Sequence, residues 1–197
     1  MEISKVHKES LVYNRMIAAA RKLFVFENGK GITIKNIVDE ANVGRGSFYK
    51  HFSNPGEVLE VLKNKEEEDC WKKMLEYYCR IPTGTFSQKI ERMAVNLTRY
   101  IELSSAFQRL VGEDAAWYKY LTESGSSDPE YAHFLEDLNT YAKSTGISEN
   151  QAKMNVHILL TAASRYAAGA INEKIPLTVK EVRTFIRKTA GLLFPEE

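Results

Sequence analysis

The chain has 197 residues, of which 44% are hydrophobic and 27% charged, a composition typical of a soluble globular protein with one or two domains. It carries 27 Lys and Arg against 26 Asp and Glu, so the net charge of +1 does not demand a polyanionic partner. No stretch has the roughly 18–20 apolar residues of a membrane span, and the N-terminus lacks the apolar run of a secretory signal. Two cysteines and four scattered histidines exclude a disulfide framework and a zinc site. We therefore expect a cytoplasmic protein with no metal and no resident cofactor.

The charge is distributed unevenly along the chain. Residues 1–52 contain nine Lys and Arg against five Asp and Glu, a net charge of +4, whereas residues 53–197 carry −3. A basic N-terminal segment on a mildly acidic remainder indicates that only the N-terminal part meets phosphate.

The first fifty residues predict three helices. Apolar residues recur at helical spacing on one face of about residues 8–27. Thr33 is a good N-cap for a short second helix that ends at Ala41. Residues 42–44 (Asn-Val-Gly) predict a tight turn, because Asn and Gly tolerate a left-handed backbone. A third helix is expected over 45–52.

The rest of the chain is also predicted to be helical, with no strand pattern. Asn54 as N-cap, Pro55 at the first helical position and Glu57 as capping-box partner open a long helix that reaches about residue 78. Further helices are expected at about residues 85–103, 105–122, 129–144, 149–173 and 178–194, with a polar Gly/Ser loop at 123–128.

Two short helices joined by a glycine-containing turn predict a helix-turn-helix. Phe48 and Phe52, four residues apart, point into the core. The outer arc is then formed by Arg45, Gly46, Ser47, Tyr49 and Lys50. Arginine can bond guanine edges, and lysine and the tyrosine hydroxyl can reach bases or phosphates. The pattern alone is also compatible with a solvated helix in a plain helical bundle.

Particular residues in this segment carry a more specific signal. Glycine, cap, apolar and aromatic positions occur in a fixed order, which runs Ala20, Leu23-Phe24, Gly29/Gly31, Thr33, Ile37, Ala41-Asn42-Val43, Gly46-Ser47-Phe48-Tyr49-Lys50-His51-Phe52, Glu57 and Leu59. Over about fifty residues this order resembles the N-terminal domain of the tetracycline-repressor (TetR) family of bacterial transcription regulators. Residues after about 80 show no family pattern.

The resemblance implies a role for each outer position of the helix-turn-helix. Thr33 would cap its helix and contact a phosphate, with Lys35 beside it at the groove edge. Base edges would face Arg45, Gly46 and Lys50, and the DNA backbone would be held by Ser47, Tyr49 and His51. The chain has Pro55 where the family commonly has a lysine, so one phosphate contact is expected to be missing.

The resemblance also implies a two-domain, all-α homodimer. We expect a helix-turn-helix DNA-binding domain over residues 1–53 and a helical ligand-binding and dimerisation domain over 54–197, with 54–79 as the connecting helix. The last two helices are apolar on more than one side, so one side is expected to meet a second subunit. The interface positions predicted on them are Leu159, Ala163, Ala167, Val182, Phe185, Ile186, Thr189 and Leu193.

A small-molecule effector is expected in the larger domain, which is rich in aromatic residues. The predicted lining is Phe107, Trp117, Tyr118, His157, Arg165 and Tyr166. Arg165 stands out as a charge on a mostly apolar helix: it pairs across the subunit interface, holds an anionic ligand or faces water. Core packing is the competing interpretation for the aromatic residues and for His157.

These observations together predict a DNA-binding transcriptional regulator, a ligand-responsive repressor that binds a palindromic operator as a homodimer. An alternative is a DNA-bound protein-interaction module without a small-molecule ligand. No nucleophile and base are spaced for catalysis and no phosphate-binding glycine loop is found, so we expect no enzyme.

Overall fold

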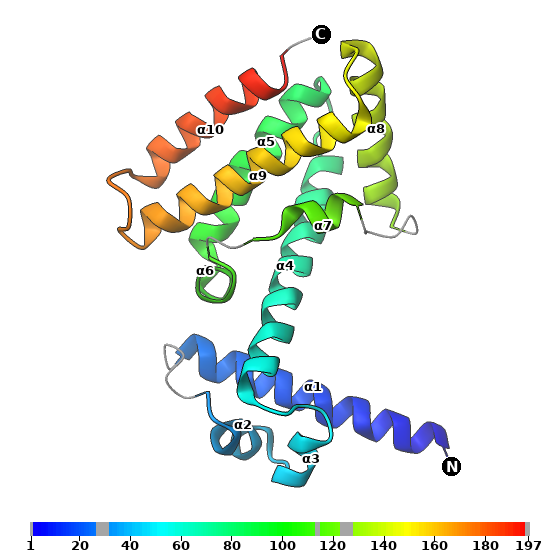
Figure 1. The fold of residues 1–197 in the computed structure, drawn as a ribbon, viewed down its shortest axis with the longest axis vertical. Helices are drawn as coiled ribbons and strands as arrows, with labels where there is room; N and C mark the ends of the chain where they lie inside the picture. The colour runs from blue at the N-terminus through cyan, green and yellow to red at the C-terminus, as the bar shows by residue number, and fades with distance from the viewer. Residues whose placement is uncertain (1, 27–31, 113–114, 123–127, 196–197) are drawn as a thin grey trace. The chain divides into compact units, whose positions relative to one another are not determined.

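The structure is a computed structural model that describes residues 2–26, 32–112, 115–122 and 128–195, with side chains from residue 11 onward in these ranges. The described residues form ten helices and no strand, which confirms the all-α prediction (Figure 1). The helices are α1 (Glu2–Phe26), α2 (Ile34–Ala41), α3 (Arg45–Tyr49), α4 (Pro55–Cys79), α5 (Phe86–Leu103), α6 (Ser105–Leu110), α7 (Trp117–Thr122), α8 (Pro129–Thr145), α9 (Glu149–Ile171) and α10 (Val179–Leu193).

The helices group into two compact units. The first unit comprises Met1–Glu66 and Ser105–Leu110, and the second comprises Glu67–Ser104 and Val111–Glu197. Helix α4 therefore begins in the first unit and ends in the second, and α6 groups with α1 to α3 although it follows α5 in sequence. The predicted domains, residues 1–53 and 54–197, were defined as parts that fold independently, and compact units do not test this. The domain boundaries stay a prediction.

The two ends of α2 are fixed by side-chain and backbone caps. Thr33 has an extended backbone, and its hydroxyl oxygen accepts a hydrogen bond from the Asn36 N–H at 3.1 Å, as the N-cap prediction requires. At the other end Asn42 takes the left-handed conformation (φ 51°) and donates its N–H to the Asp39 carbonyl at 3.1 Å. Gly44 has an ordinary φ of −79°, so only Asn42 supplies the left-handed residue that we expected of the turn.

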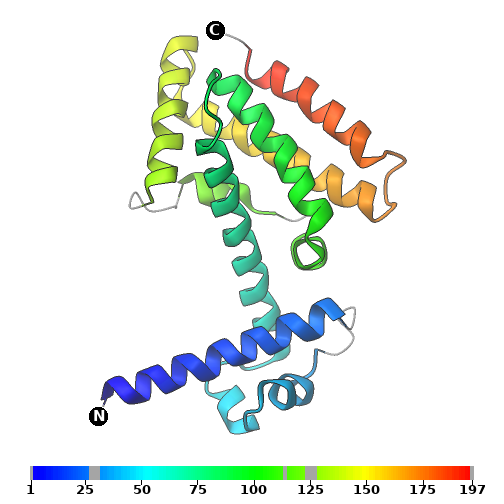
Figure 2. The same cartoon turned by 180° about the vertical axis from the view of Figure 1, so that it is seen from behind.

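The first unit has its own apolar core, to which α1, α2, α3 and the start of α4 contribute. Figure 2 shows α1 lying across α2 and α3. Met16, Ile37 and Phe48 expose no surface, and Phe52 is 5% exposed. The rings of Phe48 and Phe52 lie 5.6 Å apart, which confirms that both point inward. The predicted helix over 45–52 is too long, because α3 ends at Tyr49. A turn follows, and the Phe52 N–H donates to the Phe48 carbonyl.

Helix α4 begins at Pro55, as predicted. The Glu57 N–H donates to Asn54 Oδ1 at 3.2 Å, and the Glu57 carboxylate accepts from the Ser53 N–H at 2.8 Å. Both bonds satisfy groups that a helix start would otherwise leave unpaired.

The second unit packs α5, α9 and α10 together, with α7 and α8 against α9. Trp117, Phe134, Leu138 and Val156 lie in its core without exposed surface. The prediction of one helix over 105–122 is wrong, because α6 ends at Leu110 and α7 begins at Trp117. Gly112 takes a left-handed φ of 54° in between, a conformation that ends a right-handed helix. The predicted end of the first helix at 28–31 and most of the loop at 123–128 lie outside the described residues.

Candidate nucleic-acid interface

Helix α3 has one buried and one exposed side. Phe48 faces the core, whereas Arg45, Gly46, Tyr49 and Lys50 are exposed, with Tyr49 at 61%. The side chains on the exposed side are those that can bond base edges and phosphates. The fold of the first unit thus exposes four of the five residues of the predicted outer arc, and the fifth, Ser47, is half-buried.

The exposed Lys and Arg side chains near α3 are not paired with carboxylates in the part of the chain that the structure describes. Within the described ranges, Lys35, Arg45 and Lys50 take part in no salt bridge. By contrast, Lys22 Nζ lies 2.6 Å from Glu40, and Arg21 Nε lies 2.5 Å from Glu66. A cation without a carboxylate partner meets a phosphate without first breaking an ion pair. Positive charge that is not paired with a carboxylate is therefore present at α2 and at α3 with its C-cap residue Lys50.

The start of α2 offers a second contact point. Thr33 and Lys35 are exposed. The Thr33 hydroxyl oxygen accepts the capping bond from Asn36, which leaves the hydroxyl hydrogen able to donate outward. This end of the helix also carries the positive end of the helix dipole, which favours an anion.

The protomer's own packing does not require Gly46 to be a glycine. A Cβ built at Gly46 meets no atom within 4 Å, and its φ is not in the left-handed region. A side chain would point into open space on the exposed side of α3. The absence of a side chain therefore matters only to a molecule that approaches α3 from outside.

Ser47 and His51 differ from the other predicted contacts, because both are half-buried. The His51 ring packs 5.7 Å from the ring of Tyr13 on α1 and 6.4 Å from the ring of Phe52. All eight predicted DNA-binding residues lie in the first unit, six exposed and two half-buried. Their roles toward DNA stay predictions.

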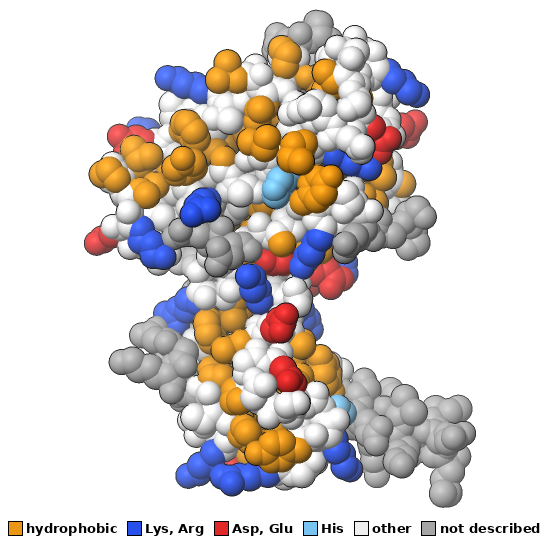
Figure 3. Space-filling model, in the orientation of Figure 1, with side chains coloured by type: hydrophobic (Ala, Val, Ile, Leu, Met, Phe, Trp, Pro, Cys, Tyr) orange, Lys and Arg blue, Asp and Glu red, His pale blue; other side chains and the backbone are white. Residues whose placement is uncertain are grey.

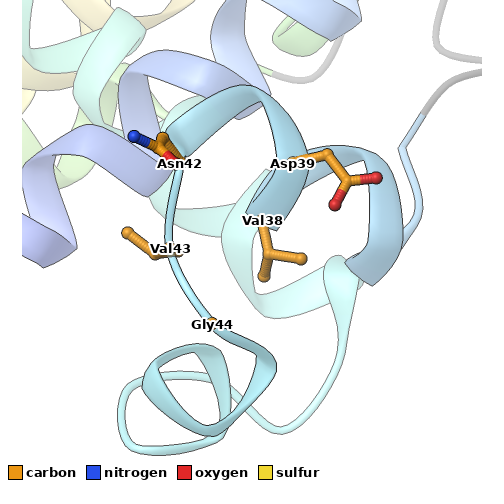
Figure 4. A pocket seen from close by; sticks show the side chains of 5 residues that line it. All are labelled: Val38, Asp39, Asn42, Val43 and Gly44. Atoms are coloured by element: carbon orange, nitrogen blue, oxygen red, sulfur yellow. The ribbon is translucent and has the colours of Figure 1, made fainter.

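A shallow hollow lies where the chain turns from α2 into α3. It is lined by Val38, Asp39, Asn42, Val43 and Gly44 (Figure 4). The sequence did not single out these residues as a site, and the left-handed Asn42 is the one signal for the turn that forms it. The exposed carboxylate of Asp39 makes this hollow a poor seat for a phosphate. The predicted phosphate contacts therefore stay with the neighbouring cations, Lys35, Arg45 and Lys50.

The predicted effector-lining residues differ in burial and are divided between the two units. Phe107 is buried on α6 of the first unit. Trp117 is buried in the second unit and donates its indole N–H to Ser164 Oγ at 2.9 Å. Arg165 and Tyr166 point outward, because the inward positions of α9 are occupied by smaller apolar residues. The role of these six residues as an effector lining stays a prediction.

Two members of the predicted lining, Tyr118 and His157, do lie together. Their rings are 5.5 Å apart with their planes at 69°. Burial lowers the pKa of His157 below its ordinary value, because the charged imidazolium is poorly solvated there. Thr161 Oγ1 lies 3.3 Å from His157 Nδ1. The pair forms part of the surface beside α9.

The predicted subunit interface needs a correction on the same two helices. The side chains of Leu159, Ala163, Ala167, Val182 and Ile186 are buried in the protomer's own core, Thr189 and Leu193 are half-buried, and Phe185 is 43% exposed. A side chain without exposed surface adds none to a subunit contact. The structure instead exposes Met154, Ile158, Tyr166, Phe185 and Leu192, which we call the α9–α10 apolar face (Figure 3).

Other classes of site receive no support from the described part of the chain. It contains no cluster of three or more His, Cys, Asp or Glu that could hold a metal ion. Neither Cys70, which is buried, nor Cys79, which is half-buried, forms a disulfide. No described helix is both long and apolar enough to cross a bilayer.

Comparison with known proteins finds one family profile and several solved structures that resemble this chain. Residues 16–62 match the sequence profile of bacterial regulatory proteins of the tetR family. No curated protein matches the sequence significantly.

Solved structures resemble the chain over nearly its whole length. A tetR-family transcriptional regulator from Pectobacterium atrosepticum has a TM-score of 0.63 at 14% identity, covering 95% of this chain and 94% of that one. The fatty acid degradation regulator FadR from Bacillus halodurans has a TM-score of 0.53 at 13% identity, covering 93% and 95%. RolR in complex with resorcinol has a TM-score of 0.50 at 18% identity, covering 96% and 98%. At these identities the likeness establishes the fold alone.

Proposed function

We propose that the chain, whose residues 16–62 match the profile of bacterial regulatory proteins of the tetR family, is a ligand-responsive repressor that binds a palindromic operator as a homodimer. The observation that carries the DNA-binding part is the exposed side of α3. There, Arg45 and Lys50 have no carboxylate partner among the described residues, and Gly46 leaves the helix surface flat. In this proposal α3 enters the major groove, and Thr33 and Lys35 contact the phosphates beside it.

The α9–α10 apolar face supports the homodimer. Ile158 and Phe185 are 44% and 43% exposed, and the Phe185 ring packs 5.2 Å from the ring of Tyr166. Large apolar side chains exposed in a row along two neighbouring helices are typical of a protein interface. A second copy of the same face would cover them, and its two-fold symmetry matches the symmetry of a palindromic operator.

A route from the second unit to the DNA-binding unit runs along the chain itself. Helix α4 is one continuous helix of 25 residues that begins in the first unit and ends in the second. Helix α6 follows α5, and its Arg109 donates to the backbone carbonyls of Phe24 and Val25 at the end of α1. We propose that an effector in the second unit shifts α4 and α6 and thereby changes the spacing of the two α3 helices. Because DNA and effector favour different spacings, each weakens the binding of the other.

RolR was solved with resorcinol bound, which supports a small molecule as the effector. A protein partner in place of the small molecule is the competing form of the proposal. Loss of operator affinity on addition of a small molecule would favour the repressor with an effector. Retention of a second protein on the DNA complex, without any such loss, would favour the interaction module.

The decisive experiment is selection of the purified chain on a random DNA duplex library, followed by a salt series on the enriched sequences. We expect an inverted repeat whose half-sites are about one helical turn apart, and an affinity that falls steeply with salt. Enrichment of a single half-site would contradict the homodimer. Absence of any enriched sequence would contradict the DNA-binding proposal itself.

A further inference from the structure

Helix α4 places two polar side chains in the interior of the second unit, one helical turn apart. Glu67 is 1% exposed and Trp71 is 3% exposed. Residues four apart share a helix face, so both side chains lie on the same side of α4. Buried polar groups are normally hydrogen-bonded, which makes the partners of these two informative.

Glu67 has a cation and a backbone N–H as partners. Its carboxylate lies 2.8 Å from Lys119 Nζ, and it accepts a hydrogen bond from the Ala116 N–H at 3.4 Å. Both partners come from the segment that leads into and forms α7. The ion pair is neutral overall and needs no further charge.

Trp71 has no such partner. Its Nε1–H is the only buried side-chain nitrogen or oxygen in the described part of the chain that lacks a hydrogen-bond partner. Trp117 makes the contrast clear, because its equally buried indole donates to Ser164 Oγ at 2.9 Å. The second unit therefore provides a hydrogen-bond acceptor for the buried indole N–H of Trp117. It provides none for the indole N–H of Trp71 among the described residues.

The surroundings of Trp71 are aromatic. The Tyr120 ring stacks on the indole at 6.0 Å with an interplanar angle of 24°, and the Phe134 ring meets it edge-on at 6.0 Å. Phe134 has no exposed surface, whereas Tyr120 and Lys119 are only half-buried. Lys119 Nζ lies 4.8 Å from the centroid of the Tyr120 ring, so a small molecule that reaches the indole has to displace this ring from both contacts.

We propose that the Trp71 N–H is the hydrogen-bond donor to an uncharged aromatic effector that carries an acceptor oxygen, such as an aryl ketone. An indole N–H can only donate, so the ligand must supply the acceptor. The flanking rings favour a flat aromatic body in place of the displaced Tyr120 ring. The neutral Glu67–Lys119 pair leaves no net charge for an ionised ligand. The inference rests on the proposed function, since it names the chemistry of the effector.

The test uses the full-length chain labelled with ¹⁵N, in which two indole N–H signals are expected. Acetophenone, ethylbenzene and benzoate are the probes: an uncharged acceptor, a similar molecule without oxygen, and an anion. The Trp71→Phe variant identifies one signal. If that variant fails to fold, Trp117→Phe leaves the Trp71 signal as the only one.

We expect acetophenone to move the Trp71 signal saturably to lower field, with the Trp117 signal unchanged. Ethylbenzene should bind at least tenfold more weakly, and benzoate should not bind more tightly than acetophenone. A Trp71 signal that does not move with acetophenone, or moves equally with ethylbenzene, overturns the proposal. Tighter binding of benzoate overturns the uncharged class.

Failure of this inference is distinguishable from failure of the proposed function. The duplex selection reports on the first unit, which does not contain Trp71. A chain that enriches an inverted repeat while its Trp71 signal stays unmoved would lose only this inference.

Discussion

The guanidinium of Arg109 donates a hydrogen bond to the backbone carbonyl of Val25, in the last turn of α1. Arg109 also reaches the Phe24 carbonyl at 3.4 Å. The last carbonyls of a helix have no partner within the helix, and a cation there complements the negative end of its dipole. A side chain from α6 thus caps the first helix of the DNA-binding unit.

Replacing Arg109 should loosen the end of α1. We expect Arg109→Ala to cost about 1 kcal/mol, because an exposed hydrogen-bonded cap is lost, and to lower Tm by about 2–4 °C. Hydrogen exchange of the last-turn amides of α1 should become faster. Arg99→Ala, an exposed arginine on α5, is the control and should change neither quantity. Unaltered exchange in Arg109→Ala would show that the cap adds nothing in solution.

The two cations of α3 should contribute to DNA affinity without contributing to the fold. Arg45→Ala and Lys50→Ala should each weaken binding to the selected operator by about 1–3 kcal/mol if the side chain bonds a base. Thermal unfolding should be unchanged, because both residues are exposed. The control is Lys143→Ala on α8. Equal weakening on operator and random duplex would make the residue a phosphate contact.

Gly46→Ala should change stability and DNA affinity in opposite directions. Alanine inside a helix is favoured over glycine by roughly 0.5–1 kcal/mol, and the added Cβ meets no atom of the protomer. The same Cβ should weaken operator binding at least tenfold, because it projects from α3 toward the groove. Gly191→Ala on α10 is matched, since its Cβ also meets nothing within 4 Å. Wild-type affinity in Gly46→Ala would mean that α3 does not approach DNA closely at this position.

A charge on the α9–α10 apolar face should separate the proposed dimer. Ile158→Glu should raise the dimer Kd at least tenfold, about 1.4 kcal/mol, because the carboxylate would lie among apolar side chains of both copies. Sedimentation velocity measures the change, and far-ultraviolet circular dichroism should show an intact fold. Leu103→Glu, at a site 86% exposed on α5, should leave the assembly as it is. A fully dimeric Ile158→Glu would move the interface elsewhere.

His157 should make the protein less stable in mild acid. Burial lowers its pKa in the folded state, so between that value and its unfolded pKa of about 6.5 the unfolded chain binds more protons. Its stabilising contribution is therefore complete above about pH 6.5 and is lost as the pH falls through the folded pKa. Urea unfolding between pH 7.5 and about pH 5 should show a shallower decline in His157→Gln than in wild type. An identical decline in both proteins would contradict a buried, neutral imidazole.

The sequence predicted local structure well at positions where the residue type and its neighbours in sequence determine the conformation. Thr33 as N-cap, Pro55 at the first turn and Phe48 facing the core depend only on neighbours in sequence, and the structure has all three. The helix over 105–122 was wrong because helical spacing continues across Gly112, whose left-handed backbone is not visible in an apolar pattern.

Tertiary choices were harder to predict. Helix α9 is apolar on two sides, and sequence could not tell which side the protomer keeps, so positions such as Ala163 were assigned to the interface although they lie in the core. Trp71 was missed for a related reason. A tryptophan at helical spacing indicates packing, and only three-dimensional structure reveals that its N–H is left without an acceptor.

The place of α6 has a consequence for modularity. Residues 105–110 lie far along the chain, yet they group with the first unit, where Leu110 packs on its core and Arg109 caps α1. A chimera cut once after Glu66 would therefore transplant an N-terminal unit without the segment that completes it. Exchange of DNA specificity between such regulators should succeed only when residues 105–110 are transferred together with the N-terminal segment. The two units are therefore interleaved in the gene and are not joined end to end.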